Sequence, residues 1–132
     1  MDKGQYTVTL DHDQGLVRVH AEGEFNADLG MQLITDARKN AAEHQYHIVC
    51  DVRESRAHVS LAEWFFLPRR LGVYTDFNTR NTKTALIVTP GRQESAYRFF
   101  ETVASNVGLR IKVFLHEEEA LEWLGTRNRL DT

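Results

Sequence analysis

The lone cysteine is the first residue whose type could do chemistry. Cys50 is the only cysteine of the chain, and His47, Asp51 and His58 lie near it in sequence, as the partners of a nucleophile would. In a strand, however, alternate residues face opposite sides, so Cys50 points away from His47 and Asp51. Free cysteine is also among the most frequently buried residue types. We therefore predict a buried, structural cysteine rather than a catalytic one.

The histidines raise the question of a metal. The chain has six, and His44 and His47 have a ligand-like spacing. That spacing crosses the junction between an expected helix and an expected strand, and neither a His-Glu-x-x-His motif nor a paired-cysteine motif accompanies it. Surface histidines are the preferred interpretation, so no metal ligand is assigned.

The carboxylates of the N-terminal part are close together in sequence, but no spacing among them specifies an acid-base pair. We interpret them as a solvated edge. They are Asp11, Asp13, Glu22, Glu24 and Asp28.

The segment 89–92, Thr-Pro-Gly-Arg, lies between an expected buried strand and an expected helix. Free backbone N–H groups and Arg92 could hold an anion there, which would allow an enzyme acting on a phosphate ester. The alternative is a plain turn in which proline and glycine serve backbone geometry, and no phosphate-loop motif is present. The expectation is a protein that is not an enzyme and needs no cofactor.

Length, composition and net charge limit the number of domains and the classes of protein to which the chain could belong. With 132 residues, 42% hydrophobic and 27% charged, the chain suits one domain spanning residues 1–132, with a core at about 6–125 and a short tail at 126–132. A net charge of -3 provides no basic footprint for nucleic acid. No apolar run is long enough to span a bilayer, and the N-terminus shows no apolar signal region. Together with the single cysteine, this predicts a cytoplasmic protein.

Hydrophobic periodicity predicts an element order of β-β-α-β-α-β-α-β-α. The first two strands alternate apolar and polar residues around a turn, which predicts a hairpin, and the central strand near residue 86 is continuously apolar, as in parallel sheets. The fold class is therefore α/β: a sandwich with a mostly parallel mixed sheet and a hairpin at one edge. The expected elements are 6–10, 17–21, 26–44, 46–52, 60–67, 84–89, 92–107, 109–115 and 116–124.

The segment 58–70, His-Val-Ser-Leu-Ala-Glu-Trp-Phe-Phe-Leu-Pro-Arg-Arg, combines a helix start with a helix breaker. Ser60 and Glu63 fit a capping box, in which each side chain bonds the backbone N–H of the other residue. Pro68 lacks an N–H and crowds the preceding turn, so we expect the helix to bend or end near Leu67.

The same segment predicts an unusual surface. At about 100° per residue, one helical face should cover the core, and its members are Leu61, Trp64, Phe65, Pro68 and Leu71. Phe66 lies off this face, on the side of Arg69 and Arg70. An exposed apolar group rimmed by charge often marks an interaction surface.

Three segments carry a resemblance to a known family. They are the strand "HIVCDVRES" (47–55), the strand and helix "TALIVTPGRQESAYRFFETVAS" (84–105) and the segment "VFLHEEEALEWL" (113–124). With the element order, they resemble the SpoIIAA-like branch of the STAS domains, named for sulfate transporters and anti-sigma-factor antagonists. The resemblance implies a bacterial-type regulatory module that binds protein partners, or in some relatives nucleotides or apolar ligands, rather than a catalyst.

The resemblance also draws attention to Ser60. In the anti-sigma-factor antagonists, a serine at the start of the helix after the third strand is phosphorylated by a partner kinase. Ser60 falls near that place, but the Asp-Ser-Ser/Thr-Gly segment of the antagonists is absent here. Ser60 is therefore either a phosphosite or only a helix cap.

Two functional hypotheses follow. The first is a non-enzymatic interaction module whose contact surface, within residues 55–74, binds a protein partner or a second copy in a two-fold homodimer. The second is a carrier or sensor of an apolar, lipid-like small ligand, held in a cleft lined by Trp64, Phe65 and Tyr74. The residues assigned to partner or ligand binding are Ser60, Trp64, Phe65, Phe66, Arg69, Arg70 and Tyr74.

Overall fold

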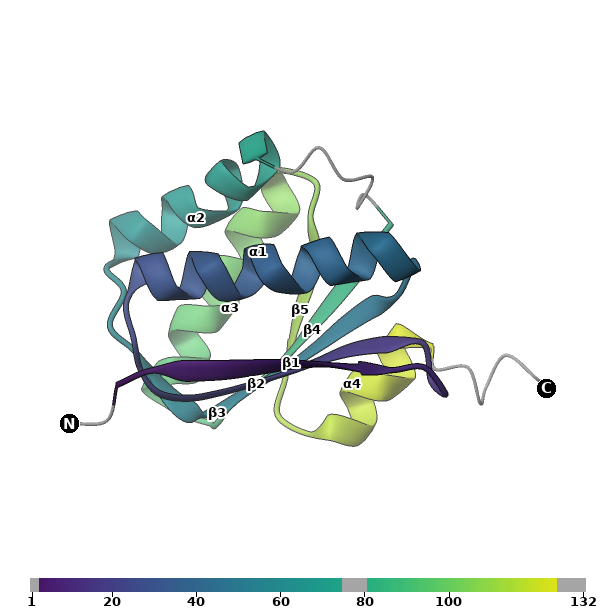
Figure 1. Ribbon diagram of the computed structural model, residues 1–132. Coiled ribbons are helices and arrows are strands. Elements are labelled where there is room, and N and C mark those ends of the chain that lie inside the picture. The colour runs from purple at the N-terminus through teal and green to yellow at the C-terminus, as the bar shows by residue number, and fades with distance from the viewer. Residues whose placement is uncertain (1–2, 75–80, 126–132) are drawn as a thin grey trace.

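The computed structural model describes residues 3–74 and 81–125, excluding the side chains of 71–74. Within these ranges the chain forms five strands and four helices in the predicted order (Figure 1). The expected tail at 126–132 lies outside the described residues. The elements are β1 (Gln5–Asp11), β2 (Leu16–Phe25), α1 (Ala27–His44), β3 (His47–Ala57), α2 (Leu61–Tyr74), β4 (Lys83–Ile87), α3 (Arg92–Asn106), β5 (Arg110–Phe114) and α4 (Glu117–Leu124).

The five strands form one mixed sheet in the order β1-β2-β3-β4-β5. β1 runs antiparallel to β2, and every later neighbouring pair is parallel, as the predicted edge hairpin and parallel sheet require. Asp11 holds the hairpin turn, because its carboxylate accepts from the backbone N–H of Gln14 at 3.1 Å and pairs with Arg18 at 2.9 Å. The sheet is thus built from one local pairing and three crossovers.

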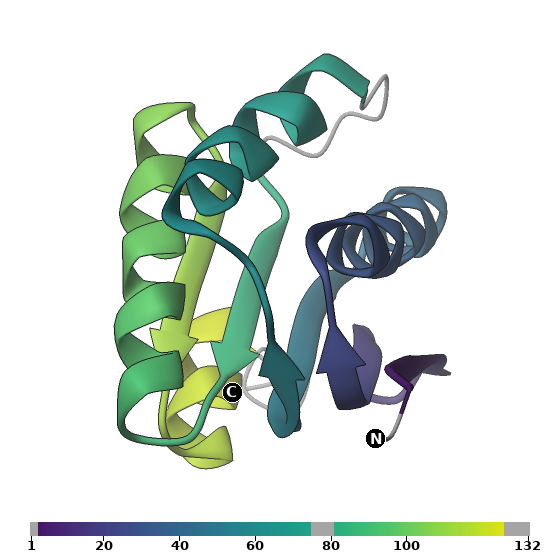
Figure 2. The ribbon, with the colours of Figure 1, turned by 90° about the vertical axis from the view of Figure 1, so that its left-hand side faces the viewer.

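The helices cover the two faces of the sheet unequally. α1, α2 and α3 lie over one face and α4 over the other, and Figure 2 shows α2 above the space between α3 and α1. The larger core lies under the three helices and includes Val17, Val19, Ala21, Ile48, Cys50, Val52, Leu86, Val88, Ile111 and Val113 from the strands. This alternation confirms the prediction that Cys50 is buried on the face opposite Val49 and Asp51.

The smaller core lies beneath α4. It joins Ala120 and Leu124 of that helix to Val49, Ala85 and Ile87 of the strands, with Leu16 beside them. Since α4 packs on β3, β4 and β5, the part of this face formed by β1 and β2 has no helix over it among the described residues. That part of the sheet is polar.

Local signals explain why α1 forms where it does. Asn26 caps the helix, accepting from the backbone N–H of Leu29 at 2.8 Å, and Gln45 ends it in the left-handed conformation. The buried stripe of Leu33, Ala37 and Ala41 turns small side chains toward the sheet. No helix within the described ranges is both long and apolar enough to cross a membrane.

The outer edge of the sheet at β5 is partly blocked. The backbone N–H of Val113 donates to the Glu101 carboxylate of α3 at 2.6 Å. An outward-facing donor of the edge strand is therefore already used by a side chain of the same molecule.

Candidate functional site

The start of α2 confirms the predicted capping box. The backbone N–H of Ser60 donates to Glu63 Oε1 at 2.9 Å, and the N–H of Glu63 donates to Ser60 Oγ at 3.1 Å. The expectation that the helix ends near Leu67 is wrong, because α2 continues to Tyr74 with Pro68 in its interior. Burial of Leu67 and Pro68 beneath the helix offsets the cost of an interior proline, which is about 3 kcal/mol.

The buried side of α2 is held by aromatic packing. Trp64 is 5% exposed and meets Tyr97 and Phe100 of α3 with ring centroids 5.0 and 5.3 Å away. Such tilted and edge-on contacts are favourable beyond the area they bury. Trp64, one of the residues assigned to binding, is therefore an anchor of α2 on α3.

The predicted core face of α2 is partly wrong. Leu61 and Phe65 were expected to be buried, but they are 68% and 38% exposed. The residues that are buried, Trp64, Leu67 and Pro68, form a narrower stripe rotated toward Leu67. The reason is the position of α2, which packs on α3 and α1 and so buries only the residues that face those helices. The side chains of Leu71 and Tyr74 lie outside the described residues.

The opposite side of α2 carries a continuous exposed group that we call the α2 aromatic patch. Phe66 is 55% exposed, as predicted, and its ring centroid lies 5.2 Å from that of Phe65. The Arg69 guanidinium lies over the Phe65 ring, 4.0 Å from its centroid. The patch consists of Leu61, Phe65, Phe66, Arg69 and Arg70, all exposed.

A cavity of about 60 Å³ lies beneath α2, between the three helices and the sheet. Trp64 and Leu67 line it, but Phe65 does not, so the prediction that Phe65 lines a cleft with Trp64 is wrong, and the side chain of Tyr74 lies outside the described residues. The cavity wall is almost entirely apolar, and the polar exceptions include Ser55 and Tyr97.

The candidate nucleophile is inert in this fold. Burial, with a smaller contribution from the Asp51 charge, raises the pKa of the Cys50 thiol to about 12. Burial likewise raises the pKa of Tyr97 well above its usual value. A thiol that stays protonated at neutral pH is neither a nucleophile nor a metal ligand.

The His44 and His47 pair does not form a ligand set. His47 Nδ1 accepts from the backbone N–H of Lys83 at 3.0 Å, and burial, with the charges of Lys83 and Arg110, lowers the pKa of this histidine. His44 instead lies against Tyr46, with ring centroids 5.3 Å apart, and its Nδ1 is 3.1 Å from the carbonyl oxygen of Asn40. The two rings thus serve different local contacts.

The two remaining candidates from the sequence are the 89–92 turn and Ser60, and each has a local structural role. In the 89–92 turn, Gly91 precedes α3 with a φ of 117°, a conformation that favours glycine, and it forms no side-chain cap. Ser60 is exposed, but Glu63 Oε1 lies against its backbone N–H, so a phosphate on Ser60 would meet a carboxylate. The geometry at Ser60 is that of a helix cap.

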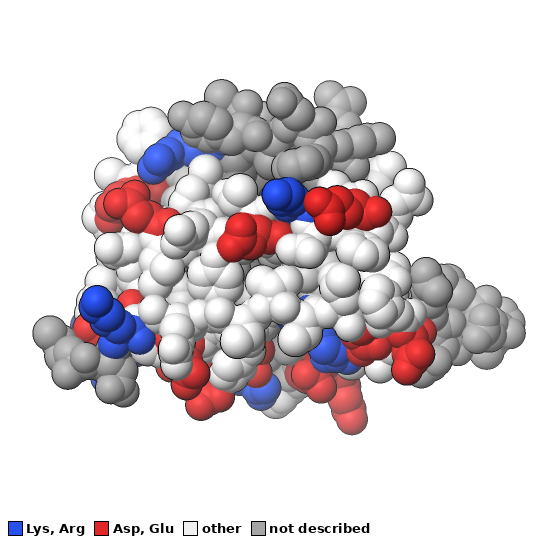
Figure 3. Space-filling view, in the orientation of Figure 1, with Lys and Arg blue, Asp and Glu red and all other residues white. Residues whose placement is uncertain are grey.

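The charges give no sign of a nucleic-acid surface on the face shown in Figure 3. There, the basic and acidic side chains of the described residues are interspersed, without a broad basic area.

One group was missed by sequence reasoning. Glu22 was interpreted as one of several solvated carboxylates, yet the structure brings it together with His20 and Glu54 on the helix-free part of the sheet. Alternation in β2 could have paired His20 with Glu22. Regular alternation in β3 would place Glu54 on the face opposite His20 and Glu22, because a regular pattern does not allow for an irregularity in that strand.

Comparison with known proteins shows the fold. No protein-family model matches the chain, and no curated protein matches it. The class that the architecture defines is an α/β domain with a SpoIIAA-like fold, as the sequence resemblance predicted. One solved structure to which it is similar is that of an uncharacterized protein from the DUF3478 family with a SpoIIAA-like fold, from Shewanella loihica PV-4. The two are 21% identical, with a TM-score of 0.55, and the match covers 92% of this chain and 93% of that one.

Proposed function

We propose that this protein is a non-enzymatic, STAS-like regulatory module of the cytoplasm that binds a protein partner through the α2 aromatic patch. The observation that carries this proposal is the exposure of Phe66, Phe65 and Leu61 on one side of a capped helix whose other side is packed. Burying one such side chain contributes roughly 1.5–3 kcal/mol. Three of them on one surface supply enough apolar area to anchor a partner.

The charge of the patch indicates the chemistry of that partner. Arg69 and Arg70 are both exposed, and neither forms an ion pair within the described residues. Arg69 lies over the Phe65 ring, and the hydrogen bond that the structure gives it uses only Nη1, which donates to the Phe65 carbonyl oxygen. Since the chain as a whole has a net charge of -3, this local positive charge favours a protein surface with an apolar centre and an acidic rim.

The test is site-specific photo-crosslinking in native lysate, with a photoreactive phenylalanine analogue at position 66 or, as the control, at the exposed Phe99 of α3. The partner found at position 66 alone is then purified and titrated with wild type, Phe66→Glu and Arg70→Glu. We expect both variants to fold and to bind the partner at least tenfold more weakly. Arg70→Glu should also make the affinity less dependent on salt concentration. Equal crosslinking from both positions contradicts the proposal. Crosslinks from position 66 that join only two copies of this chain also contradict the proposal. So does binding of the purified protein to anionic vesicles in place of a protein partner.

A specific observation favours a second candidate, a carrier of a small apolar ligand. The cavity beneath α2 is almost wholly apolar. Its volume of about 60 Å³ is smaller than the roughly 150 Å³ of a cavity that holds one benzene molecule, so a lipid-like ligand would have to push α1 and α2 apart. Native mass spectrometry of freshly purified protein separates the candidates. A co-purifying adduct lost in a cavity-filling Ala37→Leu variant supports the carrier, and a clean mass in the wild type counts against it.

A further inference from the structure

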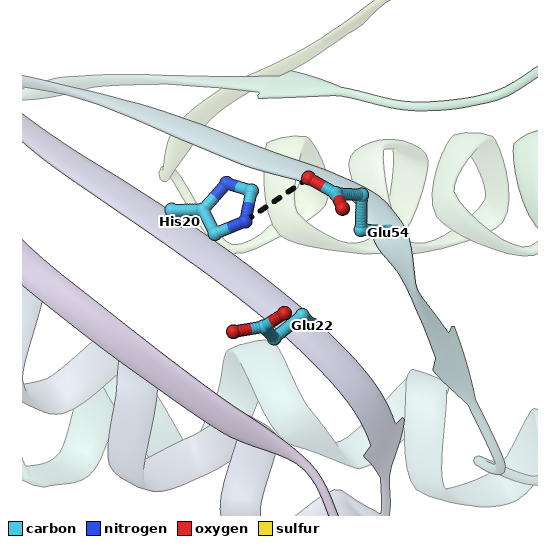
Figure 4. A group of neighbouring side chains, drawn as sticks. All are labelled: His20, Glu22 and Glu54. Atoms are coloured by element: carbon cyan, nitrogen blue, oxygen red, sulfur yellow. Dashed lines mark ion pairs between the residues drawn. The ribbon is translucent and has the colours of Figure 1, made fainter. Parts of the chain in front are cut away.

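A mixed cluster of three side chains lies on the helix-free part of the sheet, away from α2. His20 and Glu22 come from β2 and Glu54 from β3, and Figure 4 shows the three side chains on the same side of the two strands. His20 Nε2 lies 3.2 Å from Glu54 Oε1, and one ligand atom from each of the three lies within 4.8 Å of the others. Among the described residues, no other group of three or more histidine, cysteine or acidic side chains meets this spacing.

A β-bulge creates the cluster. His20 pairs with Asp51 across the β2–β3 ladder, but the next aligned pair is Glu22 with Glu54, so β3 uses one more residue than β2. In a regular strand Asp51 and Glu54, three residues apart, would face opposite sides of the sheet. The extra residue turns Glu54 to the side of Asp51 and His20, and bulges commonly redirect a side chain in this way.

The bulge places two carboxylates in an unfavourable position. Glu22 and Glu54 are direct partners across the parallel ladder, and like charges directly opposite each other destabilise a sheet. The nearby Arg53 forms a two-bonded pair with Asp51 at 2.9 and 2.8 Å, and its charge also attracts the Glu54 carboxylate, but no ion pair joins it to either glutamate within the described residues. Gln5 donates to Glu22 at 2.9 Å, which orients that carboxylate without neutralising it.

We propose that His20, Glu22 and Glu54 bind a divalent transition-metal ion, with Zn²⁺ the best match. One imidazole nitrogen and two carboxylate oxygens are donors that Zn²⁺ accepts at about 2.0–2.2 Å, and sites with three protein ligands leave further positions for water. Two ligand atoms of one such ion lie at most about 4 Å apart. His20 and Glu54 already meet this limit, and with all three ligand atoms within 4.8 Å of one another, small side-chain rotations bring Glu22 into the set. His20 also lines a neighbouring hollow of about 240 Å³ on the helix-free part of the sheet, which neither Glu22 nor Glu54 lines.

Zinc binding is tested on untagged, chelator-treated full-length protein by calorimetric titration with ZnCl₂. We expect one ion per chain, with binding weakened at least tenfold in His20→Asn and in Glu54→Gln. The matched control is His58→Asn, since His58 is also exposed and lies 3.4 Å from a glutamate, Glu24, which is its one ion-pair partner among the described residues. It should bind as tightly as wild type. Equal binding by wild type and His20→Asn overturns the site.

Thermal unfolding of Glu22→Gln gives an independent readout. Without metal, this variant should be at least as stable as wild type, because the substitution removes the repulsion from Glu54. With saturating Zn²⁺, wild type should have the higher melting temperature, because it binds the ion more tightly than Glu22→Gln does and is stabilised more by it. If Zn²⁺ leaves the melting temperature of wild type unchanged, His20 and Glu54 form an ordinary hydrogen-bonded pair and the proposal fails.

Discussion

The guanidinium of Arg69 lies over the ring of Phe65, one turn earlier on α2, and its Nη1 also donates to the Phe65 carbonyl oxygen at 3.3 Å. The cation thus shields one face of an exposed aromatic ring while the neighbouring Phe66 has no such cover among the described contacts. Phe66 is therefore the more exposed of the two phenylalanines of the α2 aromatic patch, at 55% against 38% for Phe65.

Substitutions at Phe66 and at the adjacent Leu67 should differ in their effect on the free energy of unfolding. We expect Phe66→Ser to change the free energy of unfolding by no more than about 0.5 kcal/mol, as exposed sites do. Leu67→Ala, at the adjacent 3% exposed residue, should cost about 2–5 kcal/mol. Urea unfolding followed by circular dichroism measures both. A large loss in Phe66→Ser would mean that this side chain belongs to the core.

Cys50 should be unreactive while the protein is folded. Its side chain is buried and its thiol pKa is raised to about 12, so very little thiolate forms near pH 8. We expect no labelling by a disulfide reagent under native conditions and complete labelling in denaturing guanidinium chloride. Rapid native labelling at a rate that follows thiolate formation would contradict the burial of this thiol.

Removal of the Ser60 hydroxyl should weaken the start of α2. Ser60→Ala loses the bond from the Glu63 N–H and should cost about 1 kcal/mol of unfolding free energy. Ser60→Asp keeps an acceptor at the cap and should recover most of this loss, although its charge lies near Glu63. Equal stability of wild type and Ser60→Ala would show that the capping box contributes nothing.

The Asp11–Arg18 pair predicts a dependence of stability on pH. The hydrogen bond from Arg18, aided by the N–H of Gln14, lowers the pKa of Asp11 in the folded state. Because the folded pKa is the lower one, the stabilisation is complete above the unfolded pKa of about 4 and is lost as pH falls through the folded value. Asp11→Asn should therefore cost less than about 1 kcal/mol at neutral pH, since this pair is partly exposed.

The measurement for Asp11 is urea unfolding of both proteins across the acid range. The difference between wild type and Asp11→Asn should shrink toward acid pH and should not change between about pH 6 and 8. A difference that grows on acidification would show that another group causes it.

Much of the fold could be predicted because it depends on local chemistry. Asn26 and the Ser60–Glu63 box mark helix starts by hydrogen bonds that any helix N-terminus needs, and both form. Alternation correctly assigned Cys50 to the core, because the first half of β3 is regular.

What could not be predicted depends on neighbours that are distant in sequence. Leu61 and Phe65 have the right apolar character for a core face, but the placement of α2 on α3 and α1 leaves them in water. Pro68 was expected to disrupt the helix, yet tertiary packing keeps it intact. Glu54 lies on the same side of the sheet as His20 only because β3 contains a bulge, and no residue type in that strand indicates a bulge.

The bond between Glu101 and the Val113 N–H also limits how copies of this chain could join through their sheets. With the β5 edge obstructed, β1 is the edge of the described sheet that remains for strand addition. Two copies that met β1 to β1 about a two-fold axis would cover both β1 edges and leave outward only the β5 edges, which Glu101 partly blocks. Such an association closes at a dimer instead of growing into a filament.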